Sequence, residues 1–396
     1  MVPRQAPPLI PFNSPFLPES GFRHLRQAIT NKHISADGPF TRKCHDWLEQ
    51  MFGVSKALLT TSCTHALEMI AILLELKPGD EVIVPAFTFV STVNAFVLHG
   101  ATPAFADIRP DTLNIDERLV ANLITPRTRA IVAVHYGGVA CEMHALLEIC
   151  RRHGIPLIED NAHGLFGKYD GRWLGRFGPL AALSFHETKN FSCGEGGALL
   201  INDAAFANRA EILRAKGTNR NAFFRGQVDK YTWVDVGSSY PLADALAALL
   251  YAQFEMADEI QNRRREIWNR YAIELADWAA EEGVGLPIVP ADCAHPAHLF
   301  YLILPTLEDR QAFIEHAQAR GVCSVFHYQP LHLSPMGQTW GGRPGDCPVT
   351  EYVSDRLTRL PMYFGLTEAD QDRVIRMVTS YKVRASTTRD RRRRVA

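Results

Sequence analysis

The chain has 396 residues, of which 46% are hydrophobic and 10% aromatic, and this is enough for two domains or for one large domain with a smaller appendage. A formal net charge of -1 implies no bulk electrostatic attraction to nucleic acid or to membranes. Eight scattered cysteines without a CxxC pair indicate neither a disulfide framework nor a zinc ribbon. No apolar run is long enough to cross a bilayer, and no signal-peptide pattern follows Met1, so we expect a cytoplasmic protein.

The predicted elements begin with an extended, proline-rich arm over residues 1–20, followed by a large domain over residues 21–255. In this domain, short apolar runs alternate with segments of helical spacing. We expect strands at 81–85, 103–107, 130–134, 155–160 and 182–185, and helices at 64–76, 115–124 and 142–153. Strands that alternate with helices predict an α/β fold with a large, mixed and mostly parallel sheet covered by helices. Ligands of such sheets bind beyond the carboxyl ends of the strands.

The second half of the chain predicts a smaller domain. A polar loop spans residues 216–240, and a long helical pattern from Leu242 to about Asp277 is typical of a helix that bridges two domains. Strand-like runs at 299–304 and 322–326 predict a small C-terminal α+β domain over residues 256–384. The basic run at residues 385–396 is interpreted as a solvated, disordered tail.

Lys189 is the candidate reactive residue. It follows an apolar strand that ends at Phe185 and precedes Gly194-Glu-Gly-Gly197, where glycines allow the backbone to approach a ligand. A lysine just beyond a buried strand can be desolvated, which lowers its pKa and favours the neutral amine that attacks an aldehyde. A lone lysine in this position is usually structural, but the surrounding pattern favours a reactive amine.

Two further motifs precede Lys189 in the chain. Asp160 ends the strand 156–160, where its carboxylate could keep a heteroaromatic nitrogen protonated; taken alone, it is more simply a cap or turn residue. Ser62-Cys-Thr64 precedes the helix at 66–76, whose free N–H groups and positive dipole end suit a phosphate. An ordinary helix cap explains that motif equally well.

The most specific block is Ser184-Phe-His-Glu-Thr-Lys-Asn190 followed by Gly194-Glu-Gly-Gly197. On this block the chain resembles the sugar aminotransferases of the DegT/DnrJ/EryC1/StrS family, from about Pro11 to Tyr381. The resemblance implies the fold type I (aspartate aminotransferase-like) architecture of transferases that depend on pyridoxal 5'-phosphate (PLP). The large domain would bind PLP, and PLP would supply the electron sink for transamination.

The resemblance also implies roles for residues around the ring of PLP. Lys189 would hold the cofactor as a Schiff base and act as the catalytic acid and base. Asp160 would contact the pyridinium nitrogen, and His163 would contact the ring or its 3'-oxygen. Phe89 takes the place of the aromatic residue that stacks on the ring.

Other matches concern the phosphate of PLP. Ser184, Cys63 and Thr64 match phosphate-binding positions of the family. Ser239 stands where most members have an asparagine that reaches the cofactor phosphate of the partner subunit. A serine can still donate one hydrogen bond, so Ser239 is a weaker candidate. The resemblance therefore implies a homodimer with shared active sites, and leaves higher assembly open.

Within the family, seven segments resemble a branch that serves enterobacterial common antigen synthesis: 38–42, 88–92, 94–97, 109–112, 216–220, 223–233 and 237–240. This implies conversion of dTDP-4-dehydro-6-deoxy-D-glucose plus L-glutamate to dTDP-4-amino-4,6-dideoxy-D-galactose plus 2-oxoglutarate. Candidate contacts to the nucleotide and sugar are Lys216, Arg220, Arg225 and His327, since arginine suits bidentate phosphate contacts. Each of them could equally form a salt bridge in a loop.

Four alternatives compete with this interpretation. The nearest is an aminotransferase for another 3- or 4-keto sugar nucleotide. In a related sugar dehydratase, histidine replaces the lysine, so Lys189 argues against that class. A catalytically inert regulatory protein would usually have lost the lysine or Asp160. We predict no metal site, because the ligands of known zinc sites are more tightly paired than the residues His295, His298, His327, His332, Cys293 and Cys323.

Overall fold

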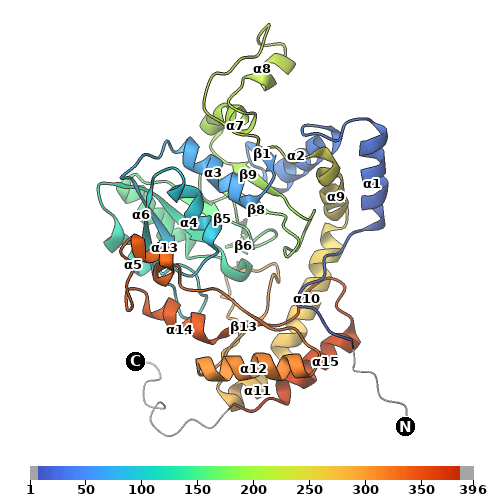
Figure 1. Ribbon diagram of the computed structural model, residues 1–396, viewed down its shortest axis with the longest axis vertical. Coiled ribbons are helices and arrows are strands. Elements are labelled where there is room, and N and C mark those ends of the chain that lie inside the picture. Colours follow the sequence, from blue (N-terminus) through green and yellow to red (C-terminus); the bar gives the residue numbers. More distant parts are fainter. Residues whose placement is uncertain (1–7, 384–396) are drawn as a thin grey trace.

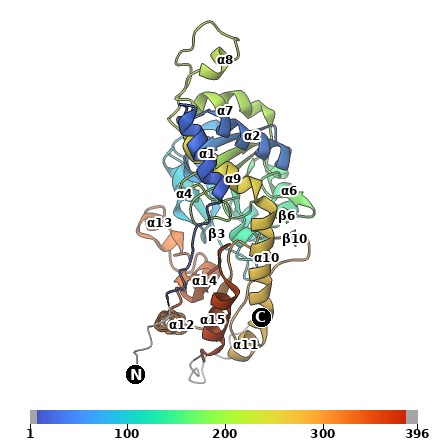
Figure 2. The same ribbon diagram turned by 90° about the vertical axis from the view of Figure 1, so that its right-hand side faces the viewer.

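The computed structural model describes residues 8–383, so the predicted basic tail at 385–396 lies outside the described residues. In Figure 1 a larger body of sheet and helices lies above a smaller one, and helix α10 (Ala257–Glu274) runs from one to the other. Figure 2 shows the same order from the side, with α8 (Arg220–Phe224) at the upper end and α11 (Ala276–Glu282) at the lower end. Placing the boundary between two domains at residue 255 stays a proposal.

The larger body is built on one seven-stranded sheet in which only β9 runs antiparallel to its neighbours. Across the sheet the strands are β1 (Lys56–Thr60), β9 (Gly197–Ile201), β8 (Leu180–Ser184), β5 (Leu157–Asp160), β4 (Thr128–Val134), β2 (Glu81–Pro85) and β3 (Thr102–Ala106). This mixed, mostly parallel sheet confirms the predicted α/β fold class. The predicted strand at 81–85 has the bounds of β2, whereas β1 had no predicted counterpart.

Helices cover both faces of the sheet. Successive residues of a strand point to opposite faces, so apolar strand residues pack against helices on each side. In β9, Leu199 packs on one face and Leu200 on the other. The first face carries α3 (Cys63–Leu73), α4 (Val90–Val97) and α7 (Ala207–Arg214). The opposite face carries α2 (Pro39–Phe52), α9 (Asp244–Glu255), α5 (Glu117–Leu123) and α6 (Met143–His153), and α1 (Glu19–Thr30) packs on α9.

The smaller body has its own three-stranded antiparallel sheet and its own core. Its strands are β11 (Tyr301–Ile303), β13 (Leu357–Arg359) and β12 (Val325–Phe326). Besides α10 and α11, its helices are α12 (Leu307–Ala319), α14 (Pro348–Arg356) and α15 (Glu368–Thr379). The short α13 (Pro335–Thr339) precedes α14, and the strands β10 (Cys293–Ala294), β6 (Lys168–Tyr169) and β7 (Arg172–Trp173) form a third sheet. The N-terminal arm joins the smaller core through Ile10, whose N–H donates to Gly321 O at 2.8 Å.

Two predictions of local structure were wrong. The helical pattern from Leu242 to Asp277 is three helices, with breaks at Met256 and Leu275. The first break has a packing reason: α9 and the start of α10 belong to the core of the large sheet, whereas Ile267 packs in the smaller core. The loop predicted at 216–240 contains the short helix α8. In the part of the chain that the structure describes, no helix combines the length and apolarity needed to span a membrane.

The buried carboxylate of Asp244 connects α9 to the start of α2, two elements far apart in sequence. It accepts hydrogen bonds from Thr41 N at 2.7 Å and Thr41 Oγ1 at 2.8 Å. We expect Asp244→Ala to lower the free energy of unfolding by about 2–4 kcal/mol, because buried donors lose a charged acceptor. Urea unfolding measures this loss. Glu315→Ala, at an exposed position of α12, is the control, and an equal change in both variants would contradict the assigned role.

Candidate active site

A cavity of about 760 Å³ lies at the carboxyl ends of the parallel strands, and residues of the smaller body close its other side. The ends of β4, β5 and β8 reach it at Val134, Asp160 and Ser184. Eight of the residues singled out in the sequence line this cavity: Cys63, Thr64, Phe89, Asp160, His163, Ser184, Lys189 and His327. The fold therefore brings together side chains that are up to 264 residues apart in the chain.

Lys189 reaches the cavity from the turn that follows β8. The turn is closed by Lys189 N, which donates to His186 O at 2.9 Å. Desolvation of the amine lowers the pKa of Lys189 to about 8, although Cys63 and Asp160 act in the opposite direction. A substantial fraction of this amine is therefore neutral and nucleophilic near pH 8.

Asp160 ends β5 and is buried at the cavity wall. Thr92 Oγ1 donates to its Oδ2 at 2.7 Å, and the N–H of Ala162 donates to its Oδ1 at 3.2 Å. Thr88 and Thr92 share a further hydrogen bond of 2.9 Å. Burial raises the pKa of Asp160, whereas its hydrogen bonds and Lys189 oppose that rise. These contacts fix the orientation of the carboxyl group.

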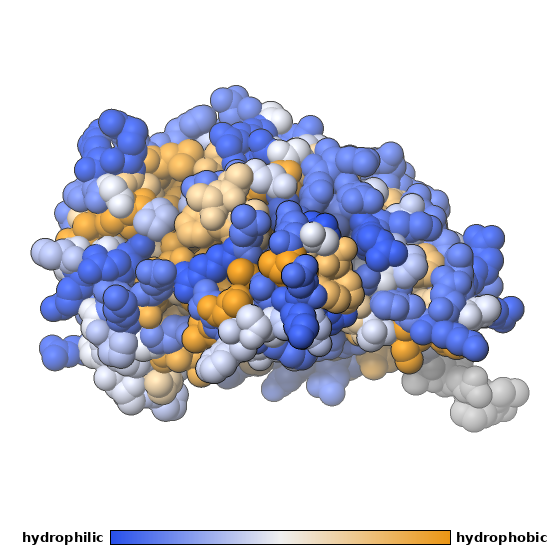
Figure 3. Space-filling model, turned by 90° about the horizontal axis from the view of Figure 1, so that it is seen from above, coloured by the Kyte–Doolittle hydropathy of each residue, from blue (hydrophilic) through white to orange (hydrophobic). Residues whose placement is uncertain are grey.

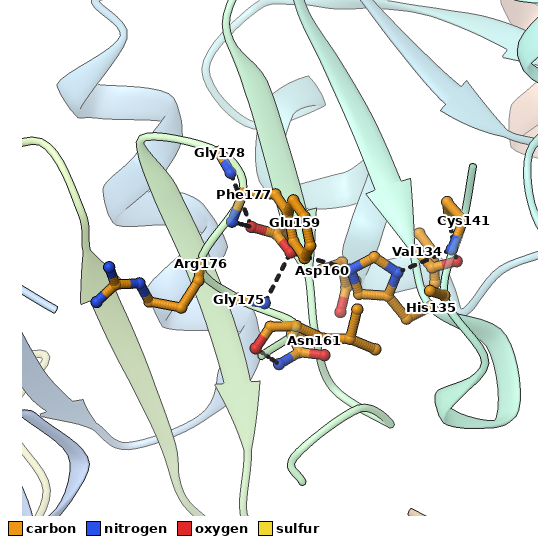
Figure 4. Close-up of polar contacts among 12 residues, drawn as sticks. Val134, His135, Cys141, Glu159, Asp160, Asn161, Gly175, Arg176, Phe177 and Gly178 are labelled. Atoms are coloured by element: carbon orange, nitrogen blue, oxygen red, sulfur yellow. Dashed lines mark hydrogen bonds and ion pairs between the residues drawn. The ribbon is translucent and has the colours of Figure 1, made fainter. Parts of the chain in front are cut away.

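The preceding residue, Glu159, is fully buried and faces away from the cavity into a closed network (Figure 4). Its carboxylate accepts the N–H groups of Gly175, Phe177 and Gly178 at 2.6–2.8 Å and bonds His135 Nε2 at 3.1 Å. The other ring nitrogen of His135 accepts from Cys141 N at 3.2 Å. This network anchors the end of β5 and so supports the position of Asp160.

His163 and His327 line the cavity beside Lys189. His163 Nδ1 accepts the N–H of Gly137 at 3.3 Å, and His327 Nδ1 bonds the hydroxyl of the buried Tyr136 at 3.0 Å. Burial lowers the pKa of both histidines well below the usual value, with nearby cations adding to the effect. Both rings are therefore neutral at pH 7, and the Nε2 of His163 carries the proton.

One end of the cavity suits a phosphate. Ser62 caps α3 by accepting from His65 N at 3.1 Å, and Ser62, Cys63 and Thr64 at this helix start all line the cavity. The free N–H groups and positive dipole end of a helix start suit an anion. Gly197 lies so close to this turn that an added Cβ would meet Cys63 N at 2.4 Å. Ser184 and Thr64 add hydroxyl groups to the same cavity. Phe89 lies at the rim of the cavity and is 56% exposed, so its ring is free to lie against a flat ligand.

Four of the predicted residues lie outside this cavity: Ser239, Lys216, Arg220 and Arg225. They belong to the segment 216–240, which projects with α8 in Figures 1 and 2. Arg225 forms an ion pair with Glu211 at 2.8 Å. Hydrophobic residues also reach the surface at this end of the molecule, among hydrophilic ones, as Figure 3 shows.

Several residues of the site had not been identified in the sequence. Thr88 and Thr92 are four residues apart near the start of a helix, so their side chains can lie on the same side. This spacing could have identified them as a pair. Phe12 and Arg359 also line the cavity, but no local motif marks either residue.

Of the four histidines weighed as metal ligands, His298 and His327 line the cavity, whereas His295 and His332 lie outside it. His332 bonds Glu351 Oε1 at 3.0 Å, and the ring of His295 packs against Trp268. Across residues 8–383, no group of three or more histidine, cysteine or acidic side chains is arranged to hold a metal ion.

Comparisons with known proteins agree on one family. The model of the DegT/DnrJ/EryC1/StrS aminotransferase family matches residues 17–379. The chain is 31% identical to the spore coat polysaccharide biosynthesis protein SpsC of Bacillus subtilis, over 93% of this chain and 96% of SpsC. The aminotransferase TlmJ from Streptoalloteichus hindustanus is 30% identical with a TM-score of 0.86, over 94% and 98% of the two chains. Spr1654 from Streptococcus pneumoniae in its PLP form is 25% identical with a TM-score of 0.87, over 94% and 98%.

Family, fold and cavity are consistent with one cofactor. The desolvated amine of Lys189 suits an aldehyde, and the buried carboxyl group of Asp160 suits a pyridine nitrogen. The start of α3 suits a phosphate. Structures of Spr1654 exist with the cofactor in its PLP form and in its pyridoxamine phosphate (PMP) form. The chain therefore belongs to the DegT/DnrJ/EryC1/StrS family of PLP-dependent sugar aminotransferases.

Proposed function

We propose that this aminotransferase converts dTDP-4-dehydro-6-deoxy-D-glucose plus L-glutamate to dTDP-4-amino-4,6-dideoxy-D-galactose plus 2-oxoglutarate. In the net reaction, the amino group of glutamate and the C4 oxygen of the sugar exchange places. The observation that carries the proposal is that Lys189 and Asp160 line the same cavity, with a neutral amine available at Lys189. Support for the sugar comes from the resemblance of segments 216–220, 223–233 and 237–240 to dTDP-4-amino-4,6-dideoxygalactose transaminase.

We assign the binding of PLP to residues of the cavity. Asp160 would bind the pyridine nitrogen, while His163 and Phe89 would contact the ring. Cys63, Thr64 and Ser184 would bind the phosphate at the start of α3 and the end of β8. When bound, PLP provides the electron sink that makes the carbon next to the transferred nitrogen acidic.

Lys189 would act as the general acid and base. Its Nζ would take the proton from the α-carbon of glutamate and later deliver a proton to C4 of the sugar. Because desolvation lowers its pKa to about 8, the amine can both accept and donate a proton near neutral pH. Delivery to one face of the sugar would give the axial amine of the galacto product.

We also propose a homodimer in which the segment 216–240 reaches the cavity of the partner chain. Ser239 would then contribute to the phosphate site, and Lys216, Arg220 and Arg225 would approach the nucleotide. Exposed aromatic side chains on this segment support the proposal, since Phe224 is 65% and Trp233 77% exposed. His327, which lines the cavity of its own chain, would contact the sugar.

The proposed function is tested by incubating the protein with PLP, L-glutamate and dTDP-4-dehydro-6-deoxy-D-glucose. We expect an amino sugar with an axial C4–N bond, identified by NMR, and one 2-oxoglutarate for each amine formed. UDP-linked and 3-keto sugar nucleotides serve as competing substrates. Faster turnover of one of these would transfer the assignment to that sugar nucleotide.

Lys189→Ala should abolish turnover, because among residues 8–383 Lys189 is the one lysine that lines the cavity and could hold the cofactor and move the proton. The measurement is amino sugar formation, together with the visible absorbance of bound PLP. Lys168→Ala is the matched control, since Lys168 lies over the ring of Trp173 outside the cavity. Full activity of the Lys189 variant would rule out the assigned mechanism.

The capture of PLP by cofactor-free protein should depend on pH. The rate should rise with pH and level off above a midpoint near 8, because the neutral amine of Lys189 is the attacking species. Stopped-flow absorbance of the cofactor gives the rate. A midpoint near 10, as for an exposed lysine, would show that burial does not lower the pKa of this amine.

A further inference from the structure

A second, much smaller cavity lies next to the first, and Lys189 and Asn13 line both of them. It is enclosed by the N-terminal arm, the turn that follows β8, and helices α9 and α10. Its volume of about 10 Å³ has room for the centre of one water-sized particle. The small cavity is therefore too small for a carboxylate or a phosphate, and its ligand is a water molecule or a monatomic ion.

Arg264 of α10 is the cation of the small cavity. Its side chain is buried, and three backbone carbonyl oxygens hold the guanidinium in place. Nε donates to Ala297 O at 3.1 Å, and Nη2 donates to His298 O at 2.6 Å and to Met362 O at 3.4 Å. Nη1 has no protein acceptor among residues 8–383. The guanidinium is thus oriented, with one nitrogen left for a ligand.

The charge of Arg264 lacks a counter-ion in the part of the chain that the structure describes. Burial lowers the pKa of Arg264 to about 9, and no carboxylate offsets this effect. Glu187 also lines the small cavity, but it is an exposed residue, and its backbone oxygen accepts from Asn13 Nδ2 at 3.0 Å. Carbonyl oxygens satisfy N–H groups without carrying a net charge. Because proteins normally pair a buried charge, a bound anion is the missing partner.

The neighbouring side chains in the small cavity have hydrogen-bond donors to spare. Ser192 Oγ already accepts a backbone N–H at 3.0 Å, so its own proton remains available. Asn190 bonds His298 Nδ1 through Oδ1 at 2.9 Å and donates to Pro296 O through Nδ2 at 2.8 Å. Its second amide N–H is left over. Together with Arg264, these donors favour an anion, whereas a cation would meet the guanidinium.

We propose that the small cavity binds one halide ion, chloride in the cell, as the counter-ion of Arg264. A water molecule could accept the same hydrogen bonds, but it would leave the buried charge unpaired. The ion would join α10 to the turn that carries Lys189, since Asn190 and Ser192 both follow that lysine closely. This inference concerns ion binding alone and holds whichever sugar nucleotide the enzyme aminates.

The direct test is diffraction from crystals of the PLP-loaded protein grown with bromide as the sole halide. An anomalous difference map at the bromine absorption edge should show a peak in contact with Arg264 Nη1. Arg263→Gln is the matched control and should keep the peak. Arg263 is the preceding residue of α10, pairs with Glu266 at 3.1 Å and does not line the small cavity. A wild-type map without a peak at Arg264 would overturn the proposal.

Thermal unfolding tests the same site in solution. Replacing gluconate by chloride at an ionic strength of about 0.2 M should raise the Tm of the wild type and of Arg263→Gln by about 1–2 °C, because the ion binds the folded state. Arg264→Gln should show no such rise and no bromide peak. Should Arg264→Gln fail to fold, Ser192→Ala decides the question: it keeps the charge, loses one donor, and should give a weaker peak and a smaller rise.

Three results would count against the halide site. An equal rise in Tm in all variants would be a general salt effect, not binding at Arg264. A bromide peak that persists undiminished in both Arg264→Gln and Ser192→Ala would place the ion on other groups. A peak seen only at molar bromide, with no effect of chloride on the Tm, would indicate an adventitious ion only.

Discussion

The buried carboxylate of Glu159 is the contact on which the geometry of the site depends. A buried carboxylate without partners would cost several kcal/mol, and here three backbone N–H groups and His135 satisfy it. These donors tie the turn at 175–178 to the end of β5. Because neighbouring strand residues point to opposite faces, fixing Glu159 on one face directs Asp160 toward α4 and the cavity on the other.

Desolvation then adjusts the chemistry of the cavity. It lowers the pKa of Lys189 and raises that of Asp160, so both groups shift toward their neutral forms. The cavity also holds Arg359 without a protein acid to neutralise it within the described residues. A cation without an acid beside it, together with the helix start at Ser62, suits an anionic group such as a cofactor phosphate.

The sequence was sufficient for the parts of the site that carry a local pattern. The sheet followed from apolar runs such as 81–85, and the glycine-rich block after β8 pointed to Lys189, which the structure places at the cavity. The pairing of Glu159 with the turn at 175–178 depends on tertiary packing, and a strand glutamate carries no local sign of it. The break at Met256 was missed because helical spacing continues through it while the core partner changes. Arg359 was missed because a single arginine after a short strand is ordinary at the level of sequence.

The two bodies of the molecule contribute different parts of the site, and one carboxylate links them. Asp107, directly after β3, accepts from Val349 N, Thr350 N and Thr350 Oγ1 at 2.8 Å each, so it caps α14 of the smaller body. Helix α14 leads directly into β13, which ends at Arg359. The large sheet thus sets the position of the guanidinium as well as that of Lys189. The lining of the cavity can therefore change through residues of the smaller body, while Lys189 and Asp160 stay in place at the ends of strands of the large sheet.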